Sequence, residues 1–368
     1  MPMFSERVKS IDISGIRKMF EGAGPNAINL GLGQPDFDTP EHIKKAAVDA
    51  INQGFTGYTA NLGIPELREA LCRKFERDNH FTVKPDEIIV TSGASEALHL
   101  ALQSLVDNGD EVLIPDPGFV SYSALAKMAG GKVVGVPLGK ELTLTPEAVN
   151  ESITPKTRVL IINSPSNPTG TVQTKHEIKA LAELAEENDI TIISDEVYEH
   201  FIYEGEHVSP AQFTDNVITI NAVSKTYAMT GWRIGYAAAR KEYIEQMLKV
   251  HQYIQACACS IAQKAALAAI VGPQECVSEM CESFRERRDI LLDGFASMGI
   301  KCVKPQGAFY AFPEVADEDA PRKLLEKGVI VTPGSAFGEN GKGHIRISYA
   351  VSEGNLRRAL AVMERVLG

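Results

Sequence analysis

The strongest constraint on the fold is a regular alternation of short apolar runs and amphipathic segments between about residues 87 and 240. The apolar runs are EIIV, EVLIP, RVLIIN, ITIIS and VITINAV, and segments such as SEALHLALQSLV, SYSALAKMA and HEIKALAELAEEN stand between them. Short apolar runs that alternate with helical segments are typical of a mostly parallel sheet covered by helices on both faces. We therefore expect a doubly wound α/β domain.

A second, smaller domain is expected from a change of pattern after about residue 272. The long charged segment ECVSEMCESFRERRDILLDGFASMG predicts a helix, and GAFYAF, GVIVTP and HIRISYA predict a hairpin and short strands. A chain of 368 residues exceeds what a single core usually holds. We assign 38–272 to the large α/β domain. Residues 1–37, which include a short expected helix in SGIRKMFEG, join 273–368 in a small α+β domain with the long linking helix.

Composition favours a small molecule as the partner. The chain has 37 basic and 48 acidic residues, a formal net charge of −11 and no basic block, which argues against nucleic acid or an anionic membrane. The sequence shows no apolar run of membrane-spanning length and no apolar signal core at its start, so we expect a cytoplasmic location. The 6 cysteines and 8 histidines lack the spacing of metal ligands or of a disulfide framework, so we expect no metal.

Polar and aromatic residues follow the apolar runs, where open α/β sheets bind their ligands. The turn SGAS at 92–95 opens a helix whose free N–H groups suit a phosphate. DPGFVSY offers the ring of Phe119 or Tyr122 to a planar ligand, and in SPSNPTG a proline holds Asn167 extended. Each feature also has a structural interpretation, as a helix-opening turn, a core aromatic or a rigid loop.

Two ionisable residues favour a ligand site over the structural interpretations when all these features are taken together. Asp195 follows ITIIS and Lys225 follows VITINAV. Alone, the first is equally well a helix N-cap and the second a charge that reaches solvent. Together with Arg233, an amide, a helix N-terminus and an aromatic ring, these two residues match the chemical groups of pyridoxal 5'-phosphate. Its aldehyde requires an amine, and its ring nitrogen requires a carboxylate. The residues therefore predict a pyridoxal phosphate site.

Ordered motifs along nearly the whole chain carry a resemblance to a known family. They are GLGQPDFDTPEHI (31–43), YTANLGIPELREA (58–70), NSPSNPTG (163–170), SDEVYEHFIYEG (194–205), SKTYAMTGWRIGYAA (224–238), GAFYAF (307–312), PGSAFG (333–338) and HIRISYA (344–350). The chain resembles the fold-type I, class I aminotransferases that use pyridoxal phosphate, above all the aspartate and aromatic amino acid aminotransferases of bacteria and archaea. The resemblance implies their fold, a large doubly wound, mostly parallel sheet domain plus a smaller α+β domain.

The resemblance also implies a role for each residue around the cofactor ring. Lys225 would bind the aldehyde and act as general base and acid. Asp195 would pair with the ring nitrogen, while Tyr198 and Asn167 would hydrogen-bond the 3′ oxygen. Phe119 would stack on the ring.

Further roles implied by the resemblance concern the phosphate and the substrate. The groups expected around the phosphate are Gly93, Ala94 and Ser95 at a helix N-terminus, together with Ser224 and Arg233. Arg346 would bind the substrate α-carboxylate with help from Asn167 and the backbone at Gly33. Tyr58 would reach the phosphate of a neighbouring subunit, which implies a homodimer with shared active sites.

The activity implied is transfer of an amino group from an L-amino acid, aspartate and/or aromatic, to a 2-oxo acid such as 2-oxoglutarate by a ping-pong mechanism. A pyridoxal phosphate-dependent C–S β-lyase would show the same cofactor residues. A cofactor-binding regulator would need a DNA-binding extension before GLGQPDF. In that motif Asp36 stands where the third glycine of a dinucleotide fingerprint belongs, which argues against an oxidoreductase of the Rossmann type.

The identity of the amino donor stays open at this stage. Ser95 stands where some aspartate-specific members carry a lysine that recognises the distal carboxylate. The residues are therefore compatible with aspartate, aromatic amino acids, alanine or a broad set. We expect the segment around Ile13, Ser14 and Ile16 to cover the pocket and to influence this choice.

Overall fold

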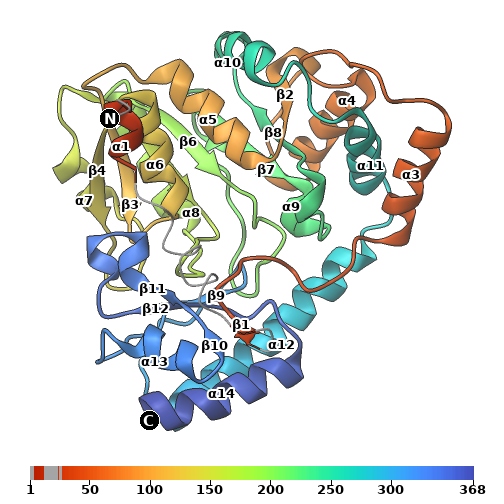
Figure 1. Cartoon of the computed structure of the whole chain (residues 1–368). Helices are drawn as coiled ribbons and strands as arrows, with labels where there is room; N and C mark the ends of the chain where they lie inside the picture. The colour runs from red at the N-terminus through yellow and green to blue at the C-terminus, as the bar shows by residue number, and fades with distance from the viewer. Residues whose placement is uncertain (1–3, 12–23, 25–26) are drawn as a thin grey trace.

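A computed structural model describes residues 4–11, 24 and 27–368, and its largest element is a seven-stranded sheet (Figure 1). The strand order is β2-β8-β7-β6-β5-β3-β4. The strands are β2 (Ile88–Thr91), β3 (Glu111–Asp116), β4 (Lys132–Pro137), β5 (Thr157–Asn163), β6 (Thr191–Asp195), β7 (Val217–Ala222) and β8 (Gly235–Ala238). All neighbours are parallel except at β8, which runs antiparallel to β2 and β7. The predicted mostly parallel sheet is confirmed.

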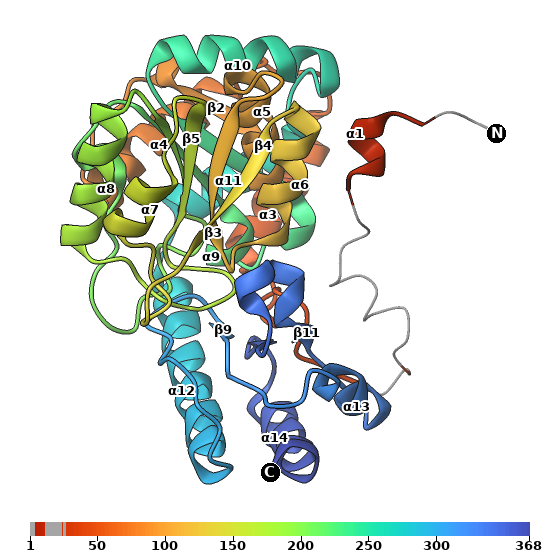
Figure 2. The same cartoon turned by 90° about the vertical axis from the view of Figure 1, so that its left-hand side faces the viewer.

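Helices cover both faces of this sheet, as Figure 2 shows for α8 and α6 on opposite sides. The helices are α3 (Glu41–Asn52), α4 (Pro65–Lys74), α5 (Ala94–Leu105), α6 (Val120–Ala129), α7 (Pro146–Ser152), α8 (Lys175–Glu187), α9 (Val223–Thr226), α10 (Lys241–Ile254) and α11 (Ser260–Val271). Successive strand residues point to opposite faces. Accordingly Ile161 and Ile193 pack in the core formed with α5 and α6, whereas Leu160 and Ile192 pack in the core formed with α8.

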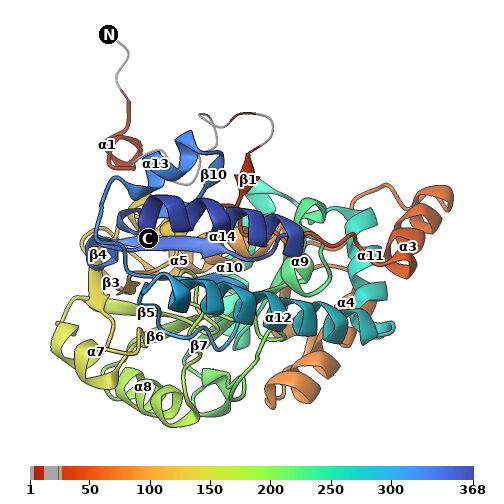
Figure 3. The ribbon, with the colours of Figure 1, turned by 90° about the horizontal axis from the view of Figure 1, so that it is seen from below.

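The remaining strands form two small sheets below the large one. Strand β1 (Ile28–Asn29) pairs in parallel with β10 (Val329–Ile330). An antiparallel sheet has the order β11 (Thr332–Pro333), β12 (Ile345–Ser348), β9 (Tyr310–Ala311). The long predicted helix is α12 (Glu275–Ser297), and it lies beside α14 (Glu353–Leu367) when the molecule is seen from below (Figure 3). Helix α13 (Ala320–Glu326) completes this part, and α1 (Glu6–Lys9), near the N-terminus, lies beside α6.

Short helical turns link these elements. Those of 3₁₀ type are Pro85–Glu87, Pro210–Gln212, Thr230–Trp232, Gly334–Phe337 and Glu339–Gly341, and a π-turn spans Phe75–Asn79. Within the described residues, no helix combines the length and apolar character needed to cross a membrane. The expected helix in SGIRKMFEG, and the expected cover from Ile13, Ser14 and Ile16, lie outside the described residues.

We propose the same division into domains that the sequence predicts. Residues 38–272 form the large domain, and residues 1–37 with 273–368 form the small one. The support is topological, because every strand of the large sheet lies between residues 88 and 238 and every strand of the small sheets lies outside that range. The two groups of elements meet below the carboxyl ends of β5, β6 and β7, where the candidate site lies.

Candidate active site

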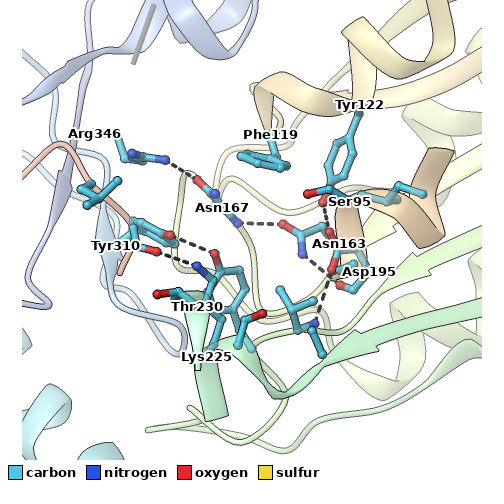
Figure 4. A pocket seen from close by; sticks show the side chains of 18 of the residues that line it. Ser95, Phe119, Tyr122, Asn163, Asn167, Asp195, Lys225, Thr230, Tyr310 and Arg346 are labelled. Carbon is cyan, nitrogen blue, oxygen red and sulfur yellow. Dashed lines mark hydrogen bonds between the residues drawn. The ribbon is translucent and has the colours of Figure 1, made fainter. Parts of the chain in front are cut away.

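A cavity lies at the carboxyl ends of β5, β6 and β7 and collects nearly all the predicted site residues (Figure 4). Those that line it are Gly33, Ala94, Ser95, Phe119, Asn167, Asp195, Tyr198, Ser224, Lys225, Arg233 and Arg346. Gly93 precedes this lining at the start of α5. Sequence reasoning gave no role to Asn163, Thr230 and Tyr310, which also line the cavity.

Lys225 lies on the one-turn helix α9, directly after β7 and not on the strand end itself. Its ammonium Nζ lies in the cavity and donates a hydrogen bond to the Gly33 carbonyl oxygen at 2.6 Å. Burial, together with repulsion from Arg346 and Arg233, lowers the pKa of Lys225 to about 8. A lysine with a lowered pKa supplies more of the neutral amine, which is the nucleophilic and basic form.

Asp195 ends β6 and points its carboxylate into the same cavity. Its Oδ2 accepts a hydrogen bond from the Tyr122 hydroxyl at 2.8 Å, and its Oδ1 accepts a longer one, at 3.4 Å, from the Val197 N–H. Burial raises the pKa of Asp195 to about 6 although these two bonds oppose the shift. The alternative interpretation of Asp195 as a helix N-cap is wrong, because the residues that follow form a turn and no helix.

A chain of hydrogen bonds joins three strand or loop residues to Arg346. The Asn163 side-chain amide donates to the Asp195 carbonyl oxygen at 2.9 Å, and its Oδ1 accepts from the Asn167 backbone N–H at 2.8 Å. The Asn167 Oδ1 in turn accepts from Nη1 of Arg346 at 2.9 Å. Asn163 was missed as a site residue, and the signal for it was a polar residue that ends the apolar run RVLIIN.

Arg346 is a buried cation between two aromatic rings. Its guanidinium lies 4.7 Å from the ring centre of Tyr310 and 4.8 Å from that of Phe337. Nη2 donates to the Gly31 carbonyl oxygen at 2.5 Å, and Nε has no partner among the described residues. Among the described residues, no carboxylate forms an ion pair with Arg346. A buried charge without a counter-ion is costly, so this position suits an anionic ligand.

The N-terminus of α5 and Arg233 form an anion-binding corner. The first-turn N–H groups of Ala94 and Ser95 have no acceptor four residues earlier in a helix. Gly93 has φ +81°, and a Cβ there would lie 2.5 Å from Nη2 of Arg233, so only glycine allows the guanidinium this close. Arg233 is held by a hydrogen bond from Nη1 to the Thr230 carbonyl oxygen at 3.0 Å. Helix N–H groups beside a guanidinium are suited to a phosphate.

Two tyrosine hydroxyls close the cavity near Lys225. The hydroxyls of Tyr198 and Tyr310 are 2.8 Å apart, and burial raises the pKa of both phenols, so both keep their protons. At Gly33 a Cβ would lie 1.9 Å from the Tyr310 hydroxyl oxygen, which explains the glycine. Tyr310 was quoted in GAFYAF without a role, because its partner lies 112 residues away.

Both aromatic candidates of DPGFVSY line the cavity. Phe119 meets the ring of Tyr122 edge-on, with ring centres 5.5 Å apart. The side chain of Tyr122 is fully buried, and its hydroxyl donates a hydrogen bond to Asp195. Tyr58 does not line the cavity of its own chain; its side chain is 91% exposed.

A buried group of possible metal ligands lies next to the site. The ligand atoms of Glu196, Glu199 and His207 are within 4.8 Å of one another. Lys74 already forms an ion pair with Glu199, and the Asn79 amide donates to both carboxylates at 2.8 and 2.7 Å. Burial opposes protonation of His207, but the carboxylates of Glu196 and Glu199 raise its pKa above the usual value. The group ties down the turn between Asp195 and Tyr198.

Known proteins are similar to this chain over nearly its whole length. The family model of the aminotransferases of class I and II matches residues 25–363. The chain is 49% identical to a probable aspartate aminotransferase of Methanocaldococcus jannaschii, covering 99% of this chain and 100% of that protein. It is 42% identical to aromatic-amino-acid aminotransferase 2 of Thermococcus litoralis, covering 99% and 98%.

A solved structure shares the fold over the whole chain. The aspartate aminotransferase of Thermus thermophilus, solved with maleate, superposes with a TM-score of 0.95 at 44% identity, covering 100% of both chains. The resemblance and the fold expected from the motifs are therefore confirmed. On this match and that of the family model, the chain belongs to the class I and II aminotransferases.

Proposed function

We propose that this aminotransferase moves the amino group of an L-amino acid, aspartate and/or aromatic, to a 2-oxo acid such as 2-oxoglutarate, with pyridoxal 5'-phosphate as cofactor. The observation that carries the proposal is the placement of Lys225, Asp195 and the uncompensated Arg346 in one cavity. The relatives named for aspartate and for aromatic amino acids support the range of donors.

The residues fit pyridoxal phosphate in charge and in hydrogen-bonding chemistry. The phosphate would be held by the first N–H groups of α5, Ser224 and Arg233, and the ring would lie against Phe119. Asp195 would hold the ring nitrogen, and Tyr198 and Asn167 the 3′ oxygen. When bound, the cofactor supplies an electron-withdrawing ring that stabilises negative charge on the substrate Cα.

Lys225 has two tasks in this proposal. Its neutral amine would hold the cofactor through the aldehyde, and the same amine, when free, would accept the proton from the substrate Cα. A pKa of about 8 places the amine near the pH at which it can both accept and return that proton. The Gly33 carbonyl oxygen orients Nζ when the amine is free.

In this proposal Arg346 positions the substrate, and Asp195 positions the cofactor ring. Arg346 binds the substrate α-carboxylate through two parallel hydrogen bonds, and Asn167 fixes the guanidinium plane. This anchors the substrate so that its Cα–H faces Lys225. The buried Asp195 carboxylate would pair with the ring nitrogen of the bound cofactor and so favour its protonated form.

The cavity wall around the substrate side chain supports a donor range that includes uncharged groups. Among the described residues, the cations that line the cavity are Lys225, Arg233 and Arg346, and each already has a role. Apart from Asp195, the rest of the lining is neutral and includes Leu32 and Ser95. Neither the C–S β-lyase nor the regulator is favoured, because the relatives are named aminotransferases.

The test of the donor range uses one amino acid at a time. Protein loaded with pyridoxal phosphate is mixed with aspartate, phenylalanine, tyrosine or alanine without an acceptor, and the released 2-oxo acid is quantified. We expect aspartate or an aromatic amino acid to give about one 2-oxo acid per subunit and then stop, as a ping-pong half-reaction requires. Release from none of these donors, in protein that has taken up the cofactor, contradicts the proposed donor range.

We also propose a homodimer in which Tyr58 of one subunit contacts the cofactor phosphate of the other. The exposed loop of Tyr58 lies on the rim of the phosphate corner, because Asn61 donates to the Ala256 carbonyl oxygen and the adjacent Gln255 donates to Ser92 Oγ, both at 2.6 Å. The side chain of Tyr253, two residues before Gln255, is also exposed. Exposed aromatic residues gathered beside an active site favour a subunit interface.

Mixing two inactive or weakened variants tests the shared site. In a dimer of Lys225→Ala and Tyr58→Ala subunits, one site carries both changes, and the other has Lys225 of one subunit with Tyr58 of its partner. We expect that second site to bind the cofactor with native affinity, whereas Tyr58→Ala alone binds it about tenfold more weakly for the lost hydrogen bond to a charged group. Tyr253→Ala removes the neighbouring exposed ring but not the proposed phosphate contact, so it controls for weakened association of the subunits. A mixed dimer no better than Tyr58→Ala alone contradicts a shared site.

A further inference from the structure

The Tyr122 hydroxyl has no role in the site as described so far. Tyr122 is a residue of α6, and its side chain is fully buried. Its hydroxyl makes one hydrogen bond among the described residues, to Oδ2 of Asp195 at 2.8 Å (Figure 4). The bond links the large-domain helix α6 to the end of β6, across 73 residues of sequence.

The direction of this bond follows from chemistry. Burial, and then the charge of Asp195, raise the pKa of Tyr122 well above its usual value, so the phenol keeps its proton and donates it. A buried phenol donates most strongly to an ionised carboxylate. The bond therefore favours the charged form of Asp195 and fixes the rotation of its carboxylate plane.

Asp195 needs such a donor because its other surroundings disfavour the charge. Burial is the dominant influence and raises its pKa to about 6, and the neighbouring carboxylate of Glu196 adds to the shift. Lys225 from α9 lowers it but less than the Tyr122 bond does. The hydroxyls of Tyr198 and Tyr310, which also face this end of the cavity, form a hydrogen bond with each other.

We propose that Tyr122 is a positioning residue that holds Asp195 ionised, with one carboxylate oxygen engaged and the other directed to the ring nitrogen of the cofactor. The inference rests on the proposed function, in which Asp195 pairs with that nitrogen. It assigns Tyr122 an electrostatic task that a core aromatic residue would not have.

Tyr122→Phe removes the hydroxyl and keeps the ring and its edge contact with Phe119. In the wild type, cofactor affinity falls as pH drops through the Asp195 pKa of about 6. In the variant that pKa is higher, so the fall starts at higher pH, and we expect affinity near pH 6 to be about tenfold weaker. The loss shrinks as pH rises, because Asp195 is then ionised in both proteins. Lys225 titrates in both the wild type and the variant, so the ratio of their dissociation constants for the cofactor reports the change at Asp195.

Two variants separate this role from packing. In an Asp195→Asn background the hydroxyl has no anion to stabilise, so adding Tyr122→Phe is expected to change the dissociation constant little. Tyr236→Phe, a buried tyrosine of β8 that packs on Phe75, is the matched control. A Tyr122→Phe loss that is the same at every pH, or the same in the Asp195→Asn background, overturns the inference.

A measurement without cofactor distinguishes failure of this inference from failure of the proposed function. The carboxyl carbons of aspartate are labelled with ¹³C in the cofactor-free protein, and the Asp195 signal is assigned by its absence in Asp195→Asn. We expect this carboxyl to titrate at about pH 6 in the wild type and at higher pH in Tyr122→Phe. Equal midpoints overturn the inference even if the cofactor binds, and a difference supports it even if the reaction proves to be another.

Discussion

Replacing Lys225 by alanine is expected to lower kcat at least about 10⁴-fold, because one amine supplies both the covalent link to the cofactor and the proton transfer at Cα. The buried ammonium is disfavoured by burial and by Arg346 and Arg233, so its removal is not expected to lower the thermal unfolding temperature. The variant should therefore fold, bind the cofactor only non-covalently, and fail at the chemical step.

The measurement combines steady-state rates with reduction of the loaded protein by borohydride and peptide mass spectrometry. In the wild type the reduced cofactor is expected on the peptide that contains Lys225, and in Lys225→Ala on no lysine. Lys241→Ala is the control, since this exposed lysine forms an ion pair with Asp86 at the surface, at 3.1 Å. Cofactor found on another lysine in the variant, or kcat within about tenfold of the wild type, removes Lys225 from the role.

Replacing Arg346 by methionine is expected to raise KM about 10²-fold for every amino donor, because two charge-assisted hydrogen bonds to the α-carboxylate are lost. Methionine is long and flexible enough to keep contact with the rings of Tyr310 and Phe337 on either side. The change also leaves Asn167 Oδ1 and the Gly31 carbonyl oxygen without their donor. We therefore expect a smaller loss in kcat as well.

The donor series decides what Arg346 recognises. A rise in KM that is alike for aspartate, phenylalanine and alanine fits binding of the shared α-carboxylate. A rise confined to aspartate would place Arg346 at the distal carboxylate and contradict the assignment. Arg285→Ala, an exposed arginine bonded to Glu282, controls for a change in net charge and should leave KM unchanged.

The large sheet was predictable because its central strands are buried on both faces and read as unbroken apolar runs. RVLIIN and ITIIS correspond to β5 and β6 within one residue at each end. Strand β8 was missed, since GYAA has small residues and no β-branched pattern. Strand β4 was missed for a different reason: it is an edge strand with mixed exposure and a glycine in the middle of KVVGVP.

Some of the site residues were likewise predictable from the sequence, and others were not. Asp195 and Lys225 were visible because a charged residue directly after a buried strand is unusual in sequence. Tyr122 and Tyr310 act through partners 73 and 112 residues away, so only the folded chain brings the pairs together. Tyr58 is exposed and does not line the cavity of its own chain, and its proposed task depends on a second copy of the chain.

The central claim is that the enzyme carries an amino group from donor to acceptor in two separable steps, and an isotope transfer tests it most directly. Protein loaded with pyridoxal phosphate receives a ¹⁵N-labelled donor, aspartate or an aromatic amino acid, the free donor is removed by gel filtration, and unlabelled 2-oxoglutarate is then added. We predict ¹⁵N-glutamate at about one per subunit and no free ammonia. Labelled ammonia released while the donor is present, and no label in glutamate afterwards, would contradict the account.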